Sequence, residues 1–125
     1  MFKQRGFSLI ETAVAVGVIV SAIIVFGMFI SSIRLVGVAQ RRAMASHIAT
    51  DQLEILRKTP FDNLAESGTI VNSDLSNIPQ GAGTYTTASF GGNAEIKEAN
   101  VYVEWVERGA TRQVRRTTLL VRNGL

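Results

Sequence analysis

Apolar and polar positions divide the chain into an apolar segment near the N-terminus and a longer mixed segment. Residues 12–33 form a run of 22 residues without a charge. Within it, residues 13–30 are apolar on every side, so the run lacks the polar face of a surface helix. A helix of about 20 apolar residues is long enough to cross a bilayer. The pattern therefore predicts a membrane-spanning helix.

The helical pattern continues beyond the apolar run. Apolar residues recur there at three- and four-residue spacing, and they are Ala45, Ile48, Ala49, Leu53 and Leu56. Glu54 and Lys58 stand four residues apart in the order that favours an ion pair. Pro60 disfavours helix in the residue before it. We therefore expect one helix over residues 9–58, about 75 Å long, whose second half packs its apolar stripe on a globular part.

The C-terminal part of the chain has the alternation typical of strands. Residues 97–107 are predicted as a strand with alternating faces, one carrying Val101, Val103 and Trp105 and the other Tyr102, Glu104 and Val106. Residues 108–110, Arg-Gly-Ala, predict a turn, and residues 111–121 are expected to pair back as a hairpin.

Residues 59–94 separate the helix from this hairpin. They are rich in Gly, Ser, Thr and Asn, and they predict a connection with short turns. We expect Phe61 and Leu64 to pack against the helix, a strand over residues 84–90 and a turn at Gly91-Gly92. The order predicts an α+β fold, with a long N-terminal helix packed on a small C-terminal antiparallel sheet.

Composition excludes several classes of chemistry. The chain has no cysteine, which rules out disulfides, thiolate chemistry and Cys-ligated metals. We find no nucleophile motif, phosphate loop or acid–base pair, and His47 is the one histidine. We therefore expect no enzyme activity, no catalytic residue, no cofactor and no metal. The net charge is only +3 and does not by itself indicate nucleic acid.

The apolar segment alone leaves three alternatives. It resembles a cleaved secretory signal, with Lys3 and Arg5 before it and residues 37–39 as a small-residue site. Against this, the run is longer than a usual signal core, and Arg34 interrupts the approach to that site. A plain single-pass anchor is the second alternative. A buried core helix is the third, which so small a domain could hardly enclose. Basic residues on both sides leave the orientation undetermined.

Glu11 distinguishes these alternatives. A carboxylate at a membrane boundary is costly unless it is paired, although a carboxylate in the first turn of a helix also suits the helix dipole. A short basic leader that ends in Gly6 precedes Phe7-Ser8-Leu9-Ile10-Glu11. In register, these residues resemble the leader and mature N-terminus of bacterial type IV prepilins and type II secretion pseudopilins.

The resemblance implies a processing pathway. A prepilin peptidase would cut the bond between Gly6 and Phe7 on the cytoplasmic face, leaving 119 of the 125 residues. Phe7 would be N-methylated. Glu11 would pair with the Phe7 amine of a neighbouring subunit during filament growth, because each charge needs the other in a low dielectric.

The resemblance also implies an organisation of the chain. Residues 1–6 are the leader, 7–33 the transmembrane and filament-core helix, and 34–125 the soluble pilin domain. That domain comprises a helix continuation over 34–58, a loop region over 59–94 and a β-hairpin over 95–125. The precursor would span the bacterial inner membrane with this domain in the periplasm and then enter a pilus or pseudopilus. Its partners would be the prepilin peptidase, other pilin or pseudopilin subunits, the inner-membrane assembly platform and the lipid bilayer.

Further details indicate an accessory subunit of a pilus or secretion pseudopilus. Pro60-Phe61 after the helix, and a Val-Glu-Trp strand before an Arg/Thr-rich strand, resemble minor pilins of the V type and minor pseudopilins of the I type. The proline that kinks many pilin helices corresponds to Met28 here, so no proline kink is expected. Gly27 still permits local melting of the helix.

The arginines of the hairpin raise an alternative. Arg112, Arg115 and Arg116 would contact DNA if the chain were a competence-type pilin, whereas a solvated strand that protects a sheet edge needs no nucleic acid. On a strand, Arg112 and Arg116 share one face and Arg115 lies on the other. Glu104 and Glu107 are expected to neutralise part of the patch. A non-assembling membrane anchor is the remaining alternative.

Overall fold

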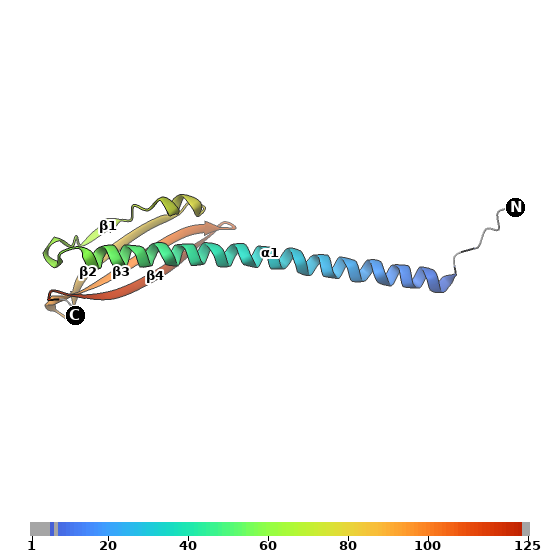
Figure 1. Ribbon diagram of the computed structural model, residues 1–125, viewed down its shortest axis with the longest axis horizontal. Coiled ribbons are helices and arrows are strands. Elements are labelled where there is room, and N and C mark those ends of the chain that lie inside the picture. Colours follow the sequence, from blue (N-terminus) through green and yellow to red (C-terminus); the bar gives the residue numbers. More distant parts are fainter. Residues whose placement is uncertain (1–5, 7, 124–125) are drawn as a thin grey trace. The chain divides into compact units, whose positions relative to one another are not determined.

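The computed structural model describes Gly6 and residues 8–123. The chain forms two compact units, divided between Val38 and Ala39. The sheet is entirely in the second unit (Figure 1). The elements, in chain order, are α1 (Leu9–Lys58), η1 (Phe61–Asn63), β1 (Ser67–Thr69), η2 (Ser73–Asn77), β2 (Ala82–Phe90), β3 (Asn93–Glu107) and β4 (Ala110–Val121).

Helix α1 has the bounds that the sequence predicts, Leu9 to Lys58. It ends because Pro60 has no N–H to continue the helical hydrogen bonds, while the Thr59 N–H still donates to the Ile55 carbonyl at 3.1 Å. The expected Glu54–Lys58 pair is wrong. Glu54 instead pairs with Arg57 at 2.8 Å, because a second hydrogen bond from Arg57 to Thr118 holds that guanidinium between helix and sheet.

The four strands form one antiparallel meander in the order β1-β2-β3-β4. Two-residue turns join the longer strands. Arg108 and Gly109 have φ of 52° and 77°, and Gly91 and Gly92 have φ of 58° and 76°. Positive φ at both positions matches the right-handed twist of the flanking strands. Both predicted turns are confirmed, except that Ala110 already belongs to β4.

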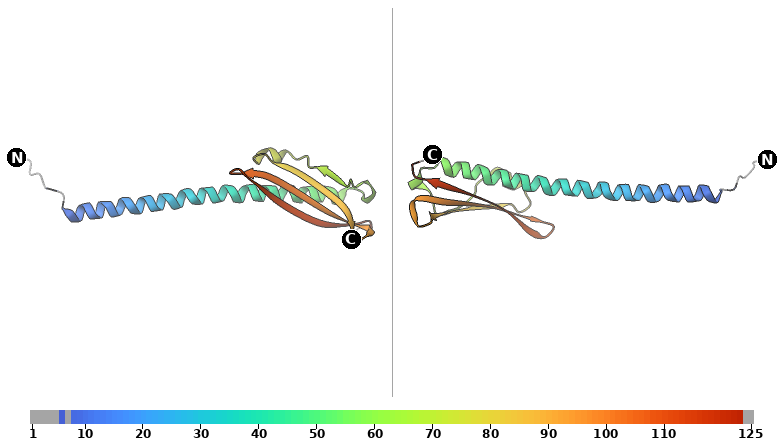
Figure 2. Two further views of the ribbon diagram at one scale, coloured as in Figure 1. Left: turned by 180° about the vertical axis from the view of Figure 1, so that it is seen from behind. Right: turned by 90° about the horizontal axis from the view of Figure 1, so that it is seen from below.

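The core of the second unit lies between α1 and one face of the sheet (Figure 2). All five residues of the predicted helix stripe are buried. The predicted inward face of β3 is confirmed as well, since Val101, Val103 and Trp105 are buried, whereas Tyr102 and Glu104 between them are not. Local periodicity in the sequence therefore predicted the buried residues of both the helix and β3.

The region over 59–94 holds more regular structure than the sequence suggests. It contains β1, β2 and two short 3₁₀ helices, and β3 begins at Asn93 instead of residue 97. Leu64 is buried, and Phe61 packs against the core as expected. Strand β1 has the sequence Ser-Gly-Thr, without apolar alternation. It forms because it pairs with β2, where Gly68 leaves room for the ring of Tyr85.

Ile48→Ala is expected to lower the free energy of unfolding by about 2–5 kcal/mol, because it leaves a cavity where Ile48 is fully buried. Ile55→Ala is the matched control on the same helix, since Ile55 is 55% exposed, and we expect a loss of about 0.5 kcal/mol or less. The fluorescence of Trp105, the only tryptophan, reports denaturant unfolding of the full chain in detergent. Equal losses would contradict the packing of this stripe.

Candidate functional site

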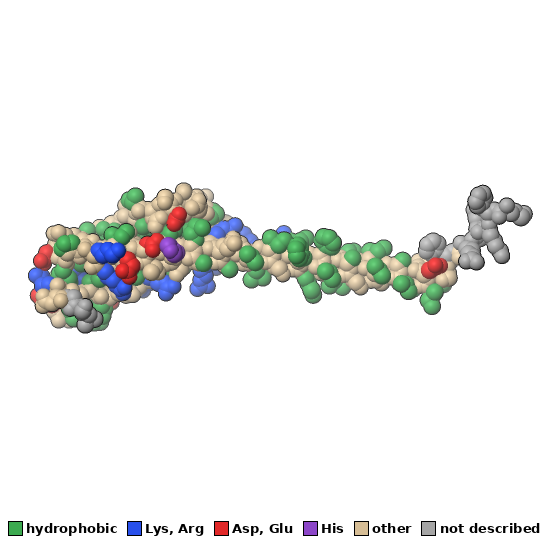
Figure 3. Space-filling model, in the orientation of Figure 1, with side chains coloured by type: hydrophobic (Ala, Val, Ile, Leu, Met, Phe, Trp, Pro, Cys, Tyr) green, Lys and Arg blue, Asp and Glu red, His purple; other side chains and the backbone are tan. Residues whose placement is uncertain are grey.

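The first unit carries an apolar helix surface without a protein partner in the chain. From Leu9 to Val36, the large apolar side chains of α1 are about half to almost fully exposed. Hydrophobic side chains project at intervals along this segment (Figure 3). By length and composition this is a helix that can cross a membrane. An exposed apolar surface of this size is typical of a site that contacts lipid or other apolar protein surfaces.

Polar side chains within this segment bond to their own helix. The Ser21 hydroxyl donates to the Gly17 carbonyl at 2.8 Å, and the Ser31 hydroxyl donates to the Gly27 carbonyl at 3.0 Å. Such bonds suit a medium without water, where a polar group needs an internal partner. Helix α1 is unbroken through Gly27 and Met28, so the local melting that Gly27 permits is not present here.

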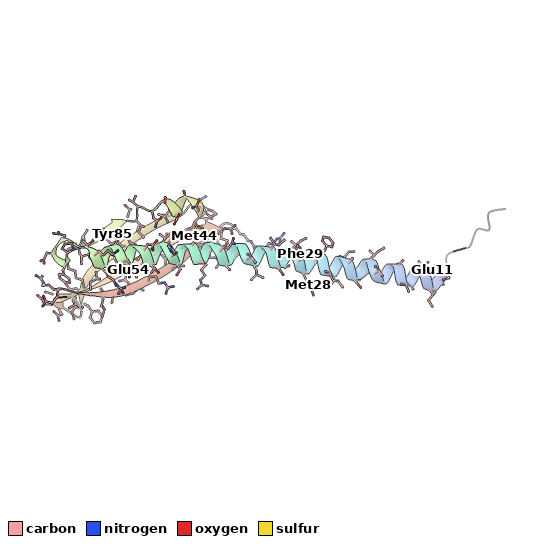
Figure 4. All side chains as sticks on the ribbon, viewed as in Figure 1. Glu11, Met28, Phe29, Met44, Glu54 and Tyr85 are labelled. Atoms are coloured by element: carbon pink, nitrogen blue, oxygen red, sulfur yellow. The ribbon has the colours of Figure 1, made fainter. Side chains whose placement is uncertain are left out.

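Glu11 lies in the first turn of α1, at the N-terminal end of the apolar segment (Figure 4). Ser8 and Glu11 form a reciprocal capping box: the Glu11 N–H donates to the Ser8 hydroxyl at 3.3 Å, and the Ser8 N–H donates to Glu11 Oε2 at 3.3 Å. Sequence reasoning missed this cap, although the Ser-x-x-Glu spacing signals it. Glu11 therefore has a local structural role besides its predicted role in assembly.

The surroundings of Glu11 leave its charge largely uncompensated. Both capping bonds are at the long end of the hydrogen-bond range, and no cation lies within salt-bridge distance in the part of the chain that is described. Gly6 is exposed and non-helical. Phe7, the predicted cleavage and methylation residue, lies outside the described residues.

The three arginines predicted as a possible DNA contact all lie on β4, on its two faces as expected. Arg116 donates to the Ser46 hydroxyl on α1 at 2.6 Å. Arg115 is on the opposite face, where it donates twice to Asn100 Oδ1, at 3.1 and 2.6 Å, and lies 5.6 Å from the ring centroid of Tyr102. Arg112 is exposed beside Trp105. The structure therefore does not gather the three guanidinium groups into one patch.

The expected neutralisation by Glu104 and Glu107 is wrong. Glu104 accepts a hydrogen bond from Gln113 at 2.6 Å. Glu107 is buried and pairs with Arg41 of α1 at 2.6 Å. The two-residue turn explains this: Glu107 ends β3 on the face that α1 covers, where Arg41 is the cation within reach.

A groove of about 570 Å³ lies between the C-terminal end of α1 and the end of β4. Leu56, Leu64 and Leu120 line its apolar side. Arg57, Lys58 and Arg122 also line it. Arg122 is paired with Asp62 and Glu95, each at 3.1 Å, and Arg57 is paired with Glu54 at 2.8 Å. Among the described residues, no three metal-binding side chains gather at one place. Nothing in the groove indicates a particular ligand.

Comparison with known proteins found no relative of the chain. No protein-family model matches the chain, and neither the curated proteins nor the solved structures include a significant match. The function is therefore argued from the residues themselves.

Arg41→Ala is expected to destabilise the second unit by about 1–3 kcal/mol, because it leaves the Glu107 carboxylate buried and unpaired. Arg57→Ala is the matched control, since it breaks a half-exposed pair with Glu54 worth less than about 1 kcal/mol. Adding Glu107→Leu to Arg41→Ala should recover part of the loss, because the buried charge is then gone. Denaturant unfolding measures all three, and no recovery would contradict this explanation.

Proposed function

We propose that this chain is a minor subunit of a bacterial type IV pilus or of a type II secretion pseudopilus, made as a precursor and cleaved between Gly6 and Phe7. Its role is structural: it inserts into the filament near the tip and helps to start assembly. The observation that carries the proposal is Glu11, a carboxylate at the start of an exposed apolar helix, five residues after the glycine of a basic leader.

The apolar helix supports this role through its surface. In the precursor, lipid of the inner membrane would cover the side chains from Leu9 to Val36. In a filament, the same side chains would pack against apolar helices of neighbouring subunits. A segment that is apolar on every side suits both environments, because neither requires a polar face.

Glu11 supports the assembly step through its charge. Inside a filament core, an ionised carboxylate without a partner is strongly unfavourable. The α-amine of a cleaved neighbour is a cation that would remove this cost. Pairing Glu11 with that amine would select the correct axial position of each added subunit, and it needs the leader to be removed first.

The other two functions have less support. DNA binding by a competence-type pilin would use Arg112, Arg115 and Arg116, but these side chains lie on opposite faces of β4 and do not form one phosphate-binding surface. A non-assembling anchor would have no use for the in-register leader. The partners that follow from the proposal are the prepilin peptidase, neighbouring subunits and the inner-membrane assembly platform.

Co-expression with an active prepilin peptidase is expected to shorten the chain by its first six residues, leaving 119. Mass spectrometry of the mature N-terminus measures the cleavage and the methyl group on Phe7 together. A chain that stays at full length beside a peptidase that cleaves a known prepilin would refute the proposal.

Glu11→Gln and Glu11→Ala are both expected to leave cleavage intact and to prevent incorporation into filaments, because the partner for the neighbouring amine is lost. Glu11→Gln is the sharper variant, since glutamine at this position still caps the helix. Ser8→Ala is the matched control, because it removes the capping hydroxyl and keeps the charge. Quantitative immunoblotting of sheared filaments measures incorporation, and normal incorporation of Glu11→Gln would contradict the pairing role.

A further inference from the structure

The outer edge of β4 is a free strand edge in the second unit. Strand β4 is the last strand in the sheet order and pairs with β3 over its whole length of 12 residues. The opposite edge strand, β1, has only three residues. Figure 2 shows β4, drawn in dark red, along the border of the sheet. A long free edge is a template for pairing with a further strand.

Two hydrogen bonds establish which residues of β4 point to this edge. The Arg122 N–H donates to the Glu95 carbonyl, toward β3. The Val106 N–H of β3 donates to the Pro79 carbonyl, away from its partner Thr111 on β4. Hydrogen-bonding direction alternates along an antiparallel strand. The odd-numbered residues of β4 therefore direct N–H and C=O groups outward, from Thr111 to Leu119.

These outward groups have no partner in the part of the chain that is described. No backbone or side-chain hydrogen bond there involves the N–H or C=O of Gln113, Arg115 or Thr117. A strand laid along this edge would satisfy them without disturbing β3. The edge thus provides the main-chain half of a strand-addition site.

The positive charge of β4 adds a preference for an acidic partner to these main-chain groups. The strand carries Arg112, Arg115 and Arg116 and no acidic residue. Among residues 6 and 8–123, none of the three lies within salt-bridge distance of a carboxylate, whereas Arg41, Arg57 and Arg122 all do. Arg112 and Arg116 lie on the face toward α1 and Arg115 on the other, so their positions on the strand flank the edge from both sides. Arg115 and Arg116 donate to the neutral partners Asn100 and Ser46, and an acidic partner strand would offer them ion pairs in place of these bonds.

We infer that the edge of β4 binds an acidic, extended segment of another protein by strand addition. A second copy of this chain fits less well, because it would place one arginine-rich strand beside another, and like charges across a strand pair are destabilising. A nucleic-acid duplex would leave the outward backbone groups unused. The inference does not depend on the proposed filament role.

The spacing of the arginines specifies the partner sequence. An antiparallel partner strand meets Arg116, Arg115 and Arg112 in that order. Opposite charges face each other when the partner carries two consecutive acidic residues and a third one three positions further on. This pattern, acid-acid-x-x-acid with β-branched residues between, defines the class of segment that the edge recognises.

The probe that tests the inference is the labelled peptide Thr-Glu-Glu-Val-Thr-Glu-Thr-Val, titrated with the full chain in non-ionic detergent and followed by fluorescence anisotropy. Its control is the same peptide N-methylated at the residues that face β4, which keeps every charge and removes the main-chain donors. We expect the unmodified peptide to bind at least about tenfold more tightly than this control.

One variant removes a backbone N–H that points to the free edge. This variant is Gln113→Pro, in which the backbone hydrogen bonds between β3 and β4 remain, and proline is tolerated at such edge positions. The side-chain bond from Gln113 to Glu104 is lost in this variant and in its alanine control alike. Gln113→Ala is its matched control, with the N–H kept. Gln113→Pro should weaken peptide binding about tenfold relative to Gln113→Ala, and replacing the three arginines with glutamine should weaken it by a similar factor.

Hydrogen exchange of the unsubstituted chain tests the same point without any variant. Peptide binding should slow exchange at the amides of Gln113, Arg115 and Thr117 and leave those of Val114 and Arg116 unchanged. Four outcomes would overturn the inference: no binding of the acidic peptide, equal binding of the N-methylated peptide, tighter binding of a short DNA duplex, or self-association of the chain that Gln113→Pro abolishes.

Discussion

The packing of the second half of α1 on the inward face of β3 is the interaction on which the second unit depends. Ala45 and Ala49 are completely buried, and their small side chains allow the helix backbone to lie close to the sheet. This packing sets the position of the helix along the strands. In this position, three polar side chains of α1 reach polar side chains of the sheet. Arg41 contacts Glu107, Ser46 contacts Arg116, and Arg57 contacts Thr118. Because α1 covers a face of the sheet and not its border, the edge of β4 remains open.

Helix α1 meets two different requirements along one continuous element. In the first unit its surface is apolar all round, and its hydroxyl groups bond to their own backbone. In the second unit only a stripe is apolar, and polar side chains cover the remainder. The first arrangement suits lipid or a helical filament core, and the second suits a sheet on one side and water on the other. The proposed subunit needs both, since it would leave the membrane and keep its soluble domain folded.

Charges fall into two groups with different consequences. Arg41, Arg57 and Arg122 pair with carboxylates of the same chain. Arg41–Glu107 and the bond from Arg57 to Thr118 join helix and sheet, and Arg122–Asp62 joins the sheet to the connection. Glu11 and the arginines of β4 have no opposite charge beside them among the described residues. Glu11 caps its own helix, and Arg115 and Arg116 donate hydrogen bonds to Asn100 and Ser46. None of these bonds supplies the opposite charge. Both features are therefore understandable as sites that another molecule completes.

The sequence by itself determined the elements whose signals are local. The bounds of α1, its buried stripe, the inward face of β3 and the two glycine turns all follow from periodicity, Pro60 and turn chemistry. The leader pattern around Gly6 and Glu11 was likewise visible in the sequence, and the filament role argued from it stays a prediction. Only the tertiary structure decided the rest. Strand β1 exists because β2 pairs with it, Glu107 meets Arg41 from 66 positions away, and the outward residues of β4 depend on the hairpin register. These depend on contacts between distant residues, which no local pattern records.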